Sequence, residues 1–261
     1  MRTISIINLK GGVGKTTTSI NLAYEFWRRG SRVLLVDCDK QGNTSKFMNC
    51  CSLEKESLSD ILLETADIRD VIVKTAYKSD TTGITLDVIQ ANMSLYAADR
   101  QLMIEVEKPQ YAHLREALEQ VQEEYDYCII DCAPGISMSI INALSASDDV
   151  IIPVVIDDFA LDGVNEILEQ MDNVKKYYNP KINFAGCLVT SYKNLDFQNE
   201  GVEALSYRFG KVFNTKINCT PMVSRSTFVK EPIYVYSKKC GAAKGYISLA
   251  DEYERMVAVN G

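Results

Sequence analysis

A glycine-rich segment with the sequence KGGVGKTTT occupies residues 10–18, between an apolar run at 3–9 and an amphipathic stretch. Glycines at a turn from strand to helix let backbone N–H groups converge on phosphate oxygens, and the helix N-terminus adds partial positive charge. Lys15 is then placed to reach β and γ phosphates, and Thr16 to bind Mg²⁺. A turn that merely joined a strand to a helix would not require Gly-Lys-Thr at the helix start. The residues expected to contact nucleotide phosphates are Gly11, Gly12, Val13, Gly14, Lys15, Thr16 and Thr17.

Carboxylates follow two further apolar runs of the chain. Asp37 and Asp39 lie at the end of the run at 32–37, and Asp131 ends the run at 127–131. Ligands of open α/β sheets bind beyond the carboxyl ends of strands, so these acids are expected beside the phosphate site. Transfer of a phosphoryl group to water requires a group that orients the water, and Mg²⁺ prefers oxygen ligands. Asp131 is therefore expected to hold Mg²⁺, directly or through water, although each acid alone would also suit a turn or a strand-end cap.

Short β-branched runs alternate with longer amphipathic stretches along the chain, which is the pattern of stacked βαβ units. Most of the runs are continuously apolar, as expected for strands covered by helices on both faces. We expect an α/β fold with one mostly parallel, twisted sheet, in a single domain over residues 1–261, because no linker or repeat divides the chain. The expected strands are 3–9, 32–37, 85–90, 127–131, 149–155, 183–190 and 212–217. The expected helices are 15–29, 96–106, 112–124, 139–146, 161–178, 197–209 and 241–257, and residues 50–83 are the least regular.

The glycine-rich segment departs from the common G-x-x-x-x-G-K-[ST] pattern, because Leu9 stands where the first glycine is usual and Lys10 precedes Gly11. In this form it resembles KGGxGK[ST], the deviant Walker A loop of the ParA/MinD/nitrogenase-iron-protein ATPases, a class of P-loop NTPases. Two further segments are similar to motifs of that family: VDCDKQGN to D-x-D-P-Q-G-N, with Lys40 in place of proline, and DCAPG to D-x-P-P. The stretch from YDYCIID to FALDGV and the segments VFNTKI, EPIYVY and GAAKGYISLADEY extend the resemblance over nearly the whole chain.

The resemblance implies a switch in which two subunits close over two ATP molecules and slowly hydrolyse them, with Mg²⁺, to ADP and phosphate. In the family the extra lysine reaches the phosphates bound by the other subunit of the homodimer, which implies that role for Lys10. The second acid of the D-x-D motif orients the attacking water, which implies that role for Asp39, so the expected catalytic residues are Lys10, Lys15 and Asp39. The loop near the adenine in relatives implies nucleotide contacts at Pro221 and Met222, although INCT replaces the usual IPRN before them. The resemblance further implies a ParB-like partner that stimulates hydrolysis, and a role in partitioning a plasmid, a chromosome or a mobile element.

The net charge is unevenly distributed along the chain. The sequence has 28 Lys and Arg against 35 Asp and Glu, a net charge of −7 that disfavours nucleic acid as a partner. Residues 205–245, however, hold eight basic residues and one acid, so this window carries +7 and the rest of the chain −14. The window is either a solvated surface or a surface for non-specific contact with DNA, as in ParA relatives. Its candidate DNA-binding residues are Arg208, Lys211, Lys216, Arg225, Lys230, Lys238, Lys239 and Lys244.

Composition and the chain ends narrow the alternatives. The eight cysteines include no CxxC pair, and His113 is the single histidine. The sequence therefore offers few residues from which a zinc site or a histidine-based catalytic site could be built. No apolar signal segment precedes Arg2, and no run reaches the roughly 20 apolar residues of a membrane span, so we expect a cytoplasmic protein. The resemblance further implies association with the nucleoid when ATP is bound. An ATP-bound DNA-binding regulatory module and a MinD-like positioning ATPase stay open as alternatives. The final LADEYERMVAVNG is acidic, which weighs against the basic amphipathic membrane anchor of the MinD type.

Overall fold

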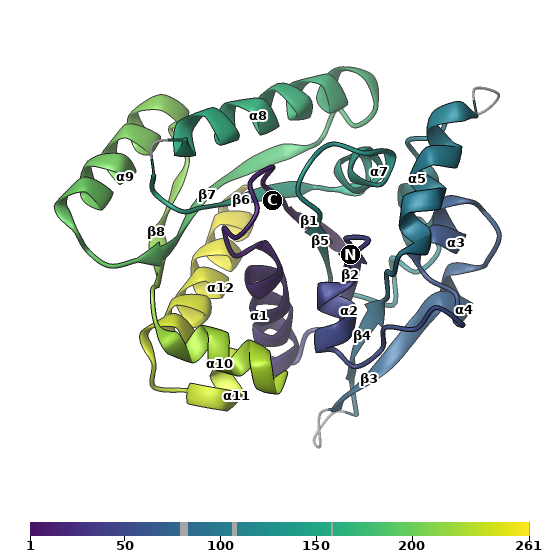
Figure 1. Ribbon diagram of the computed structural model, residues 1–261, viewed down its shortest axis with the longest axis horizontal. Coiled ribbons are helices and arrows are strands. Elements are labelled where there is room, and N and C mark those ends of the chain that lie inside the picture. The colour runs from purple at the N-terminus through teal and green to yellow at the C-terminus, as the bar shows by residue number, and fades with distance from the viewer. Residues whose placement is uncertain (79–82, 106–108, 158, 261) are drawn as a thin grey trace.

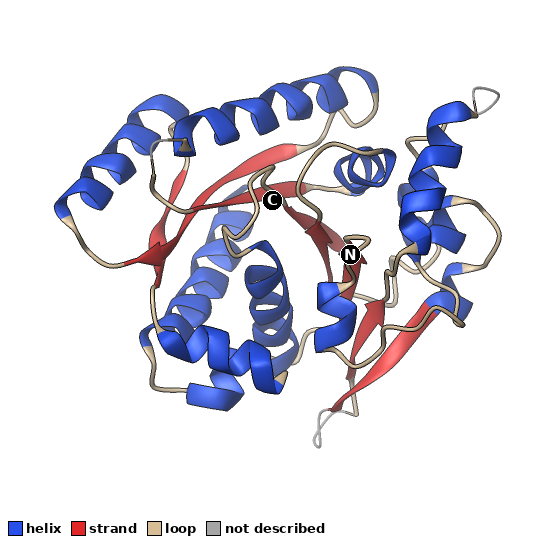
Figure 2. Ribbon diagram, viewed as in Figure 1, coloured by secondary structure: helices blue, strands red, loops and turns tan. Residues whose placement is uncertain are grey.

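A twisted sheet runs through the protein, and helices cover both of its faces (Figures 1 and 2). The computed structural model describes residues 1–260 except 79–82, 106–108 and 158. In the residues that it describes, eight strands form the sheet: β1 Arg2–Ile6, β2 Val33–Cys38, β3 Ile72–Lys78, β4 Thr85–Ile89, β5 Tyr127–Cys132, β6 Asp149–Val154, β7 Asn183–Tyr192 and β8 Val212–Asn218.

Helices lie between most of the strands along the chain, singly or in groups of two or three. Those before β5 are α1 Lys15–Arg28, α2 Asn43–Phe47, α3 Leu58–Leu62, α4 Ile68–Val71, α5 Ser94–Ile104 and α6 His113–Glu119. Those after β5 are α7 Met138–Ala146, α8 Ala160–Tyr177, α9 Asp196–Phe209, α10 Pro221–Val229, α11 Ile233–Ser237 and α12 Gly241–Asn260. Segments from the two ends of the chain pack together, because α1 and α12 lie side by side on one face of the sheet (Figure 1).

The strand order is β3-β4-β2-β5-β1-β6-β7-β8. Each described pair of neighbours is parallel except β3 and β4, which are antiparallel at one edge of the sheet. The carboxyl ends of the parallel strands therefore lie along one edge, where ligands of open α/β sheets bind. The expected α/β fold with a mostly parallel sheet is confirmed.

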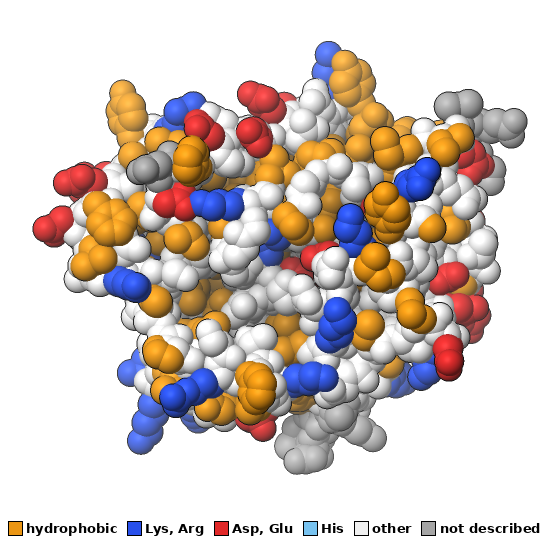
Figure 3. All heavy atoms as spheres, viewed as in Figure 1, with side chains coloured by type: hydrophobic (Ala, Val, Ile, Leu, Met, Phe, Trp, Pro, Cys, Tyr) orange, Lys and Arg blue, Asp and Glu red, His pale blue; other side chains and the backbone are white. Residues whose placement is uncertain are grey.

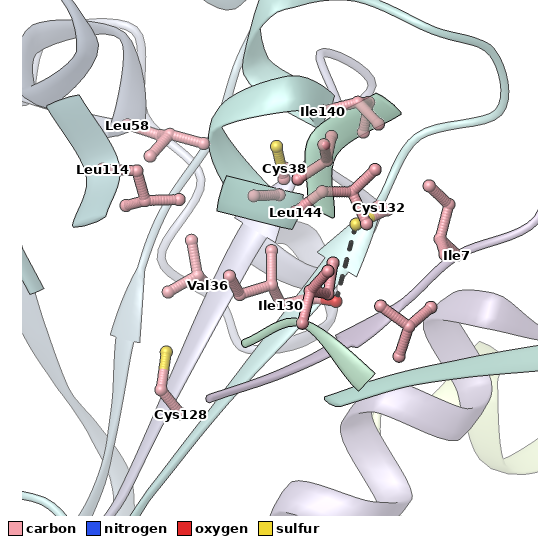
Figure 4. Close-up of a cluster of buried hydrophobic side chains, with 14 of the residues drawn as sticks. Ile7, Val36, Cys38, Leu58, Leu114, Cys128, Ile130, Cys132, Ile140 and Leu144 are labelled. Carbon is pink, nitrogen blue, oxygen red and sulfur yellow. Dashed lines mark hydrogen bonds between the residues drawn. The ribbon is translucent and has the colours of Figure 1, made fainter. Parts of the chain in front are cut away.

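Two apolar cores flank the sheet. One lies between the sheet and helices α3 to α9, and Figure 4 shows part of it, with Val36 of β2 and Ile130 of β5 facing Leu114 and Leu144. The other lies between the opposite face and helices α1, α2 and α10 to α12, and includes the fully buried Phe26 and Tyr253. Burial on both faces explains why the central strands are continuous apolar runs in the sequence.

The first strand is shorter than expected, and several elements were not predicted. The strand expected at 3–9 ends at Ile6. Beyond it, the side chain of Asn8 forms hydrogen bonds in place of backbone pairing between strands, because its Nδ2 donates to Pro153 O at 2.7 Å and its Oδ1 accepts from Lys10 N at 2.9 Å. The edge strand β3 lies in the segment 50–83 that was least regular in sequence. The short helices that the sequence analysis did not predict are α2, α3, α4, α10 and α11.

Three expected helices have clearly different ends, and one of them, expected at 241–257, is α12, which extends to Asn260. The helix expected at 112–124 is α6, which stops at Glu119 and continues as turns. The helix expected at 96–106 is α5, which spans Ser94–Ile104, and residue 106 lies outside the described residues. Among the helices of the described chain, none is long and apolar enough to cross a membrane.

Candidate functional site

The carboxyl ends of β1, β2 and β5 lie next to one another and bring three sequence-predicted segments together. β5 is the middle strand of the three, and its Asp131 is in register with Ile6 of β1 and with Asp37 of β2. The glycine-rich loop leaves β1 at this edge, and Asp39 directly follows β2. Segments that are far apart in the chain thus form one site.

The glycine-rich loop has a backbone conformation that suits an anion site. Gly12 and Gly14 have positive φ angles of 77° and 87°, which glycine adopts without steric cost. Gly14 directly precedes α1, and its carbonyl accepts a hydrogen bond from Thr18 N. Thr190 Oγ1 of β7 donates to the carbonyl of Val13 at 2.8 Å and so fixes the loop. The first N–H groups of α1, which have no intrahelical partners, are available to phosphate oxygens.

Lys15 is the first residue of α1 and is only 7% exposed. Its Nζ donates to the carbonyl oxygen of Lys10 at 2.8 Å, so the ammonium group lies against the loop itself. Burial lowers the pKa of Lys15, and the attraction of Asp131 opposes this shift. An ammonium group held in this way can exchange a carbonyl partner for a phosphate oxygen.

Asp131 has surroundings that fit Mg²⁺. Its carboxylate, 1% exposed, accepts hydrogen bonds from Thr44 Oγ1 at 2.7 Å and from Ser19 Oγ at 3.1 Å, and Thr16 also hydrogen-bonds to it. Burial raises the pKa of Asp131, and the three hydroxyl groups oppose this shift. The oxygens gathered here are the hard ligands that Mg²⁺ prefers. Thr16 and Asp131 would hold the ion, together with phosphate and water oxygens.

A different kind of metal site would be built from several protein side chains. In the part of the chain that the structure describes, no group of three or more His, Cys, Asp or Glu side chains is placed to hold a metal ion. A magnesium site of the P-loop type needs few protein ligands, because the nucleotide phosphates supply part of the octahedral shell.

The two acids that follow β2 have different surroundings. Asp37 is fully buried and accepts hydrogen bonds from Ser45 N at 2.8 Å and Ser45 Oγ at 2.6 Å. Burial raises the pKa of Asp37, and repulsion by Asp131 adds to the shift. Asp39 is 8% exposed, and its Oδ1 accepts a hydrogen bond from Gln41 N at 2.9 Å. Asp37 is thus part of the packed interior, whereas Asp39 lies in the loop next to the phosphate site.

Lys10 makes an ion pair within its own chain. Its Nζ donates to Asp157, which follows β6, and lies 5.9 Å from the centre of the Phe159 ring. The side chain of Lys10 is 40% exposed, in contrast to that of Lys15, which is buried. One lysine of the loop is therefore inside the site and the other is at its surface.

A cavity of about 320 Å³ opens beside Thr16 and Thr17. Its walls come from α1, α2 and α10, and they include Asn21, Phe47 and Thr227. Pro221 and Met222, expected near adenine, form the first turn of α10 and do not line this cavity, whose α10 wall comes from the later residues of that helix. The segment after β8 was expected to be a loop, and the structure corrects this to a helix.

The start of α10 is marked in the sequence. Thr220 precedes the helix and its side chain accepts a hydrogen bond from Met222 N, while Pro221 occupies the first turn. Thr-Pro is a typical start signal for a helix, because proline lacks the N–H that would have no partner there. The same signal could have identified α10 from the sequence.

The basic residues of the window 205–245 do not form a single patch. Lys211 lies at the amino ends of β7 and β8, where its Nζ donates to Asn183 Oδ1 at 3.0 Å and to Phe184 O at 2.8 Å. Lys216 and Lys244 line a groove between β8 and α12. The others belong to α9, to α10 and its end, and to the segment after α11, and they are Arg208, Arg225, Lys230, Lys238 and Lys239. Figure 3 shows Lys and Arg side chains along the lower edge of the drawn face, over α10 and α11.

Sequence analysis missed five side chains at the site. Ser19, Thr44 and Ser45 bind the two buried acids, Thr190 fixes the loop, and Asp157 pairs with Lys10. Serine, threonine and aspartate are common in loops and helix starts, so their types gave no signal. Their contacts depend on the strand order, which the sequence does not state.

Comparison with known sequences shows extensive similarity. Residues 1–184 match the family described as an AAA domain. The chain is 38% identical to the sporulation initiation inhibitor protein Soj of Bacillus subtilis (strain 168), over 99% of this chain and 98% of that protein. It is 34% identical to the chromosome partitioning protein ParA of Caulobacter vibrioides (strain NA1000 / CB15N), over 97% of this chain and 93% of that protein.

Solved structures share the fold. The cobyrinic acid a,c-diamide synthase of Mycobacterium smegmatis, which contains bound ADP and magnesium, matches with a TM-score of 0.84 and 26% identity over 100% of this chain and 97% of that chain. The cell division ATPase MinD of Pyrococcus furiosus matches with a TM-score of 0.77 over 98% of this chain and 99% of that chain. At 21% identity, the second likeness concerns the fold alone.

Proposed function

The chain belongs to the ParA/MinD superfamily of P-loop ATPases, and from this premise we propose that it is a homodimerising ATPase that partitions DNA with a ParB-like partner. The observation that carries this proposal is the meeting of Lys15, Asp39 and Asp131 at the adjacent ends of β1, β2 and β5. Similarity to Soj and ParA over nearly the whole chain supports a role in partitioning. The proposed location is the cytoplasm, on the nucleoid when ATP is bound.

In the proposed reaction, water attacks the γ-phosphorus of ATP while the bond to the β–γ bridging oxygen breaks, giving ADP and inorganic phosphate. Asp39 orients the water and accepts a hydrogen bond from it. Lys15, together with Lys10 from a second copy of the chain, stabilises the negative charge of the transition state. Thr16 and Asp131 would hold Mg²⁺, which would neutralise negative charge on the phosphates.

The adenosine part of ATP is proposed to enter the cavity beside Thr16 and Thr17. Its volume of about 320 Å³ lies at the lower end of the range for small-molecule pockets, and it adjoins the phosphate loop directly. Ile20 and Phe47 offer apolar walls, and Asn21 and Thr227 offer polar groups. Contacts from Pro221 and Met222 at the start of α10 stay a prediction.

Size-exclusion chromatography of the Asp39→Ala variant tests the switch. With ATP and Mg²⁺ this variant should bind nucleotide, fail to hydrolyse it and accumulate as a dimer, whereas Lys15→Ala should bind no nucleotide and stay monomeric. Asp39→Ala protein that hydrolyses ATP at the wild-type rate would show that another group orients the water.

Binding to DNA separates this proposal from the alternatives. A partition ATPase should bind DNA with ATP only, without sequence preference and with an affinity that falls steeply with salt. An ATP-bound regulatory module should instead bind a specific site regardless of hydrolysis. A MinD-like positioning ATPase with a membrane target should bind anionic liposomes when ATP is present.

A further inference from the structure

The helix α2 directly follows the loop of Asp39, and its second and third residues, Thr44 and Ser45, are fully buried. Thr44 Oγ1 donates to Asp131 Oδ2 at 2.7 Å. Ser45 donates to Asp37 Oδ2 twice, from its backbone N at 2.8 Å and from its Oγ at 2.6 Å. Two successive residues of α2 are thus bonded to the ends of two different strands.

The two acids are neighbours in the sheet, because Asp37 of β2 and Asp131 of β5 are in register. Ser45 Oγ also accepts a hydrogen bond from Ala91 N at 2.9 Å, which ties α2 to the segment after β4. The start of α2 is therefore held by hydrogen bonds to several segments, and the bond from Thr44 is the one that reaches the carboxylate of Asp131.

Thr44 differs from the other hydroxyl groups around Asp131 in what it connects. Ser19 Oγ, which donates to Asp131 Oδ1, also hydrogen-bonds to Lys15 O, within its own helix α1. Thr44 instead joins Asp131 to the helix that follows the water-orienting loop.

We infer that Thr44 is a positioning residue that orients the Asp131 carboxylate toward Mg²⁺ and holds α2 in place relative to the metal. The inference rests on the proposed function, because the magnesium role of Asp131 is part of it. A second group that hydrogen-bonds to a metal-binding carboxylate fixes its orientation, and loss of such a partner commonly lowers metal affinity or activity by about 10- to 100-fold.

The test measures how much Mg²⁺ strengthens the binding of a fluorescent, non-hydrolysable ATP analogue. Affinity is measured with MgCl₂ and again with EDTA, for wild type, Thr44→Val, Thr44→Ser and Thr18→Val. Thr44→Val keeps the shape of the side chain and removes the hydroxyl group, while Thr44→Ser keeps the hydroxyl group. Thr18→Val is the matched control, because Thr18 is also fully buried on the neighbouring α1 but its hydroxyl group lies 3.4 Å from that of Tyr246.

Thr44→Val should lower the gain from Mg²⁺ about tenfold and leave the affinity in EDTA nearly unchanged. Thr44→Ser should restore most of the gain, and Thr18→Val should retain it. An unchanged gain in Thr44→Val, or an equal loss with and without Mg²⁺, would overturn the inference. If Thr44→Val does not fold, Thr44→Ala provides the same comparison. Hydrogen exchange of residues 43–47 in Thr44→Ser gives a second readout. In that variant, Mg²⁺ and the analogue should protect these residues from exchange as strongly as in the wild type. Wild-type protein that binds no nucleotide would refute the proposed function itself. That outcome differs from a failure of the inference about Thr44, in which the wild type binds nucleotide and only the effect of the variant is missing.

Discussion

The ammonium group of Lys10 is paired with the carboxylate of Asp157 in the same chain. Lys10 belongs to the glycine-rich loop after β1, and Asp157 follows the adjacent strand β6. If Lys10 acts on the nucleotide of a second copy, it must leave Asp157 when the dimer forms. In the proposed dimer, this ion pair would compete with the contact of Lys10 across the interface.

Replacement of Asp157 by Asn should strengthen the ATP-dependent dimer. The paired side chains are 40% and 36% exposed, and exposed ion pairs contribute at most about 1 kcal/mol, so the expected gain is at most about fivefold for each lysine released. Sedimentation equilibrium with a non-hydrolysable ATP analogue measures it. Asp162→Asn, the same charge change on the first turn of α8, is the control. A weaker dimer in Asp157→Asn would mean that this acid contributes to the dimer directly.

The neighbouring acids Asp37 and Asp131 predict how stability depends on pH. Burial raises the pKa of Asp37, so the folded protein binds more protons there than the unfolded chain does. The free energy of unfolding should therefore fall as pH rises above about 4, by at most about 1.4 kcal/mol per pH unit for this group. Asp37→Asn should make the slope less negative in urea unfolding between about pH 5 and 7. An identical slope in the variant would show that Asp37 is not the group responsible.

Gly42 and Gly210 form a matched pair for a test of local packing. Both have positive φ angles, 61° and 69°, but a Cβ at Gly42 would lie 2.6 Å from Ala91 O, whereas nothing lies within 4 Å of one at Gly210. Gly210→Ala should cost about 1–2 kcal/mol for its backbone conformation alone, and Gly42→Ala about 1–3 kcal/mol more for the overlap. Urea unfolding of both variants measures the difference. Equal losses would mean that α2 shifts freely away from Ala91.

Two residues of the basic window, Arg225 and Lys211, should contribute differently to DNA binding. Arg225 lies exposed on α10, near the cavity beside Thr16 and Thr17. Lys211 lies at the amino ends of β7 and β8 and donates hydrogen bonds to Asn183 and Phe184. Arg225→Gln should reduce the slope of log affinity against log salt by about 0.9, the value for one phosphate contact on duplex DNA. Lys211→Gln should leave that slope unchanged. Filter binding over a salt series, with ATP present, measures the slope for both variants. A reduced slope in Lys211→Gln alone would mean that DNA contacts the surface around Lys211 and not α10.

Much of the fold and of the phosphate site could be predicted because the signals are local. The run from Lys10 to Thr18 combines a strand end, glycines and a helix start, and its chemistry follows from neighbouring residues. The central strands are buried on both faces, so apolar composition alone marks them. The edge strand β3 and short helices such as α2 lack that signal, because little of their sequence is continuously apolar.

The remaining contacts depend on tertiary structure. Thr44 reaches Asp131 only because β5 lies between β1 and β2, and nothing near Thr44 in the sequence indicates this. The same is true of Thr190, whose hydroxyl group holds the glycine-rich loop from β7. The charge window is a further example: Lys211 contacts the start of β7, whereas Arg225, which is close to it in sequence, lies on helix α10.

The position of β5 also determines when the site can form during synthesis. In the described structure β1 pairs with β5 and β6, and both are made long after the glycine-rich loop has left the ribosome. A nascent chain that ends before Tyr127 carries the complete KGGVGKTTT motif and Asp39, but its β1 has no partner strand and its Asp131 does not yet exist. The candidate nucleotide site therefore cannot be complete before β5 has been made, because β5 supplies both Asp131 and a partner strand for β1.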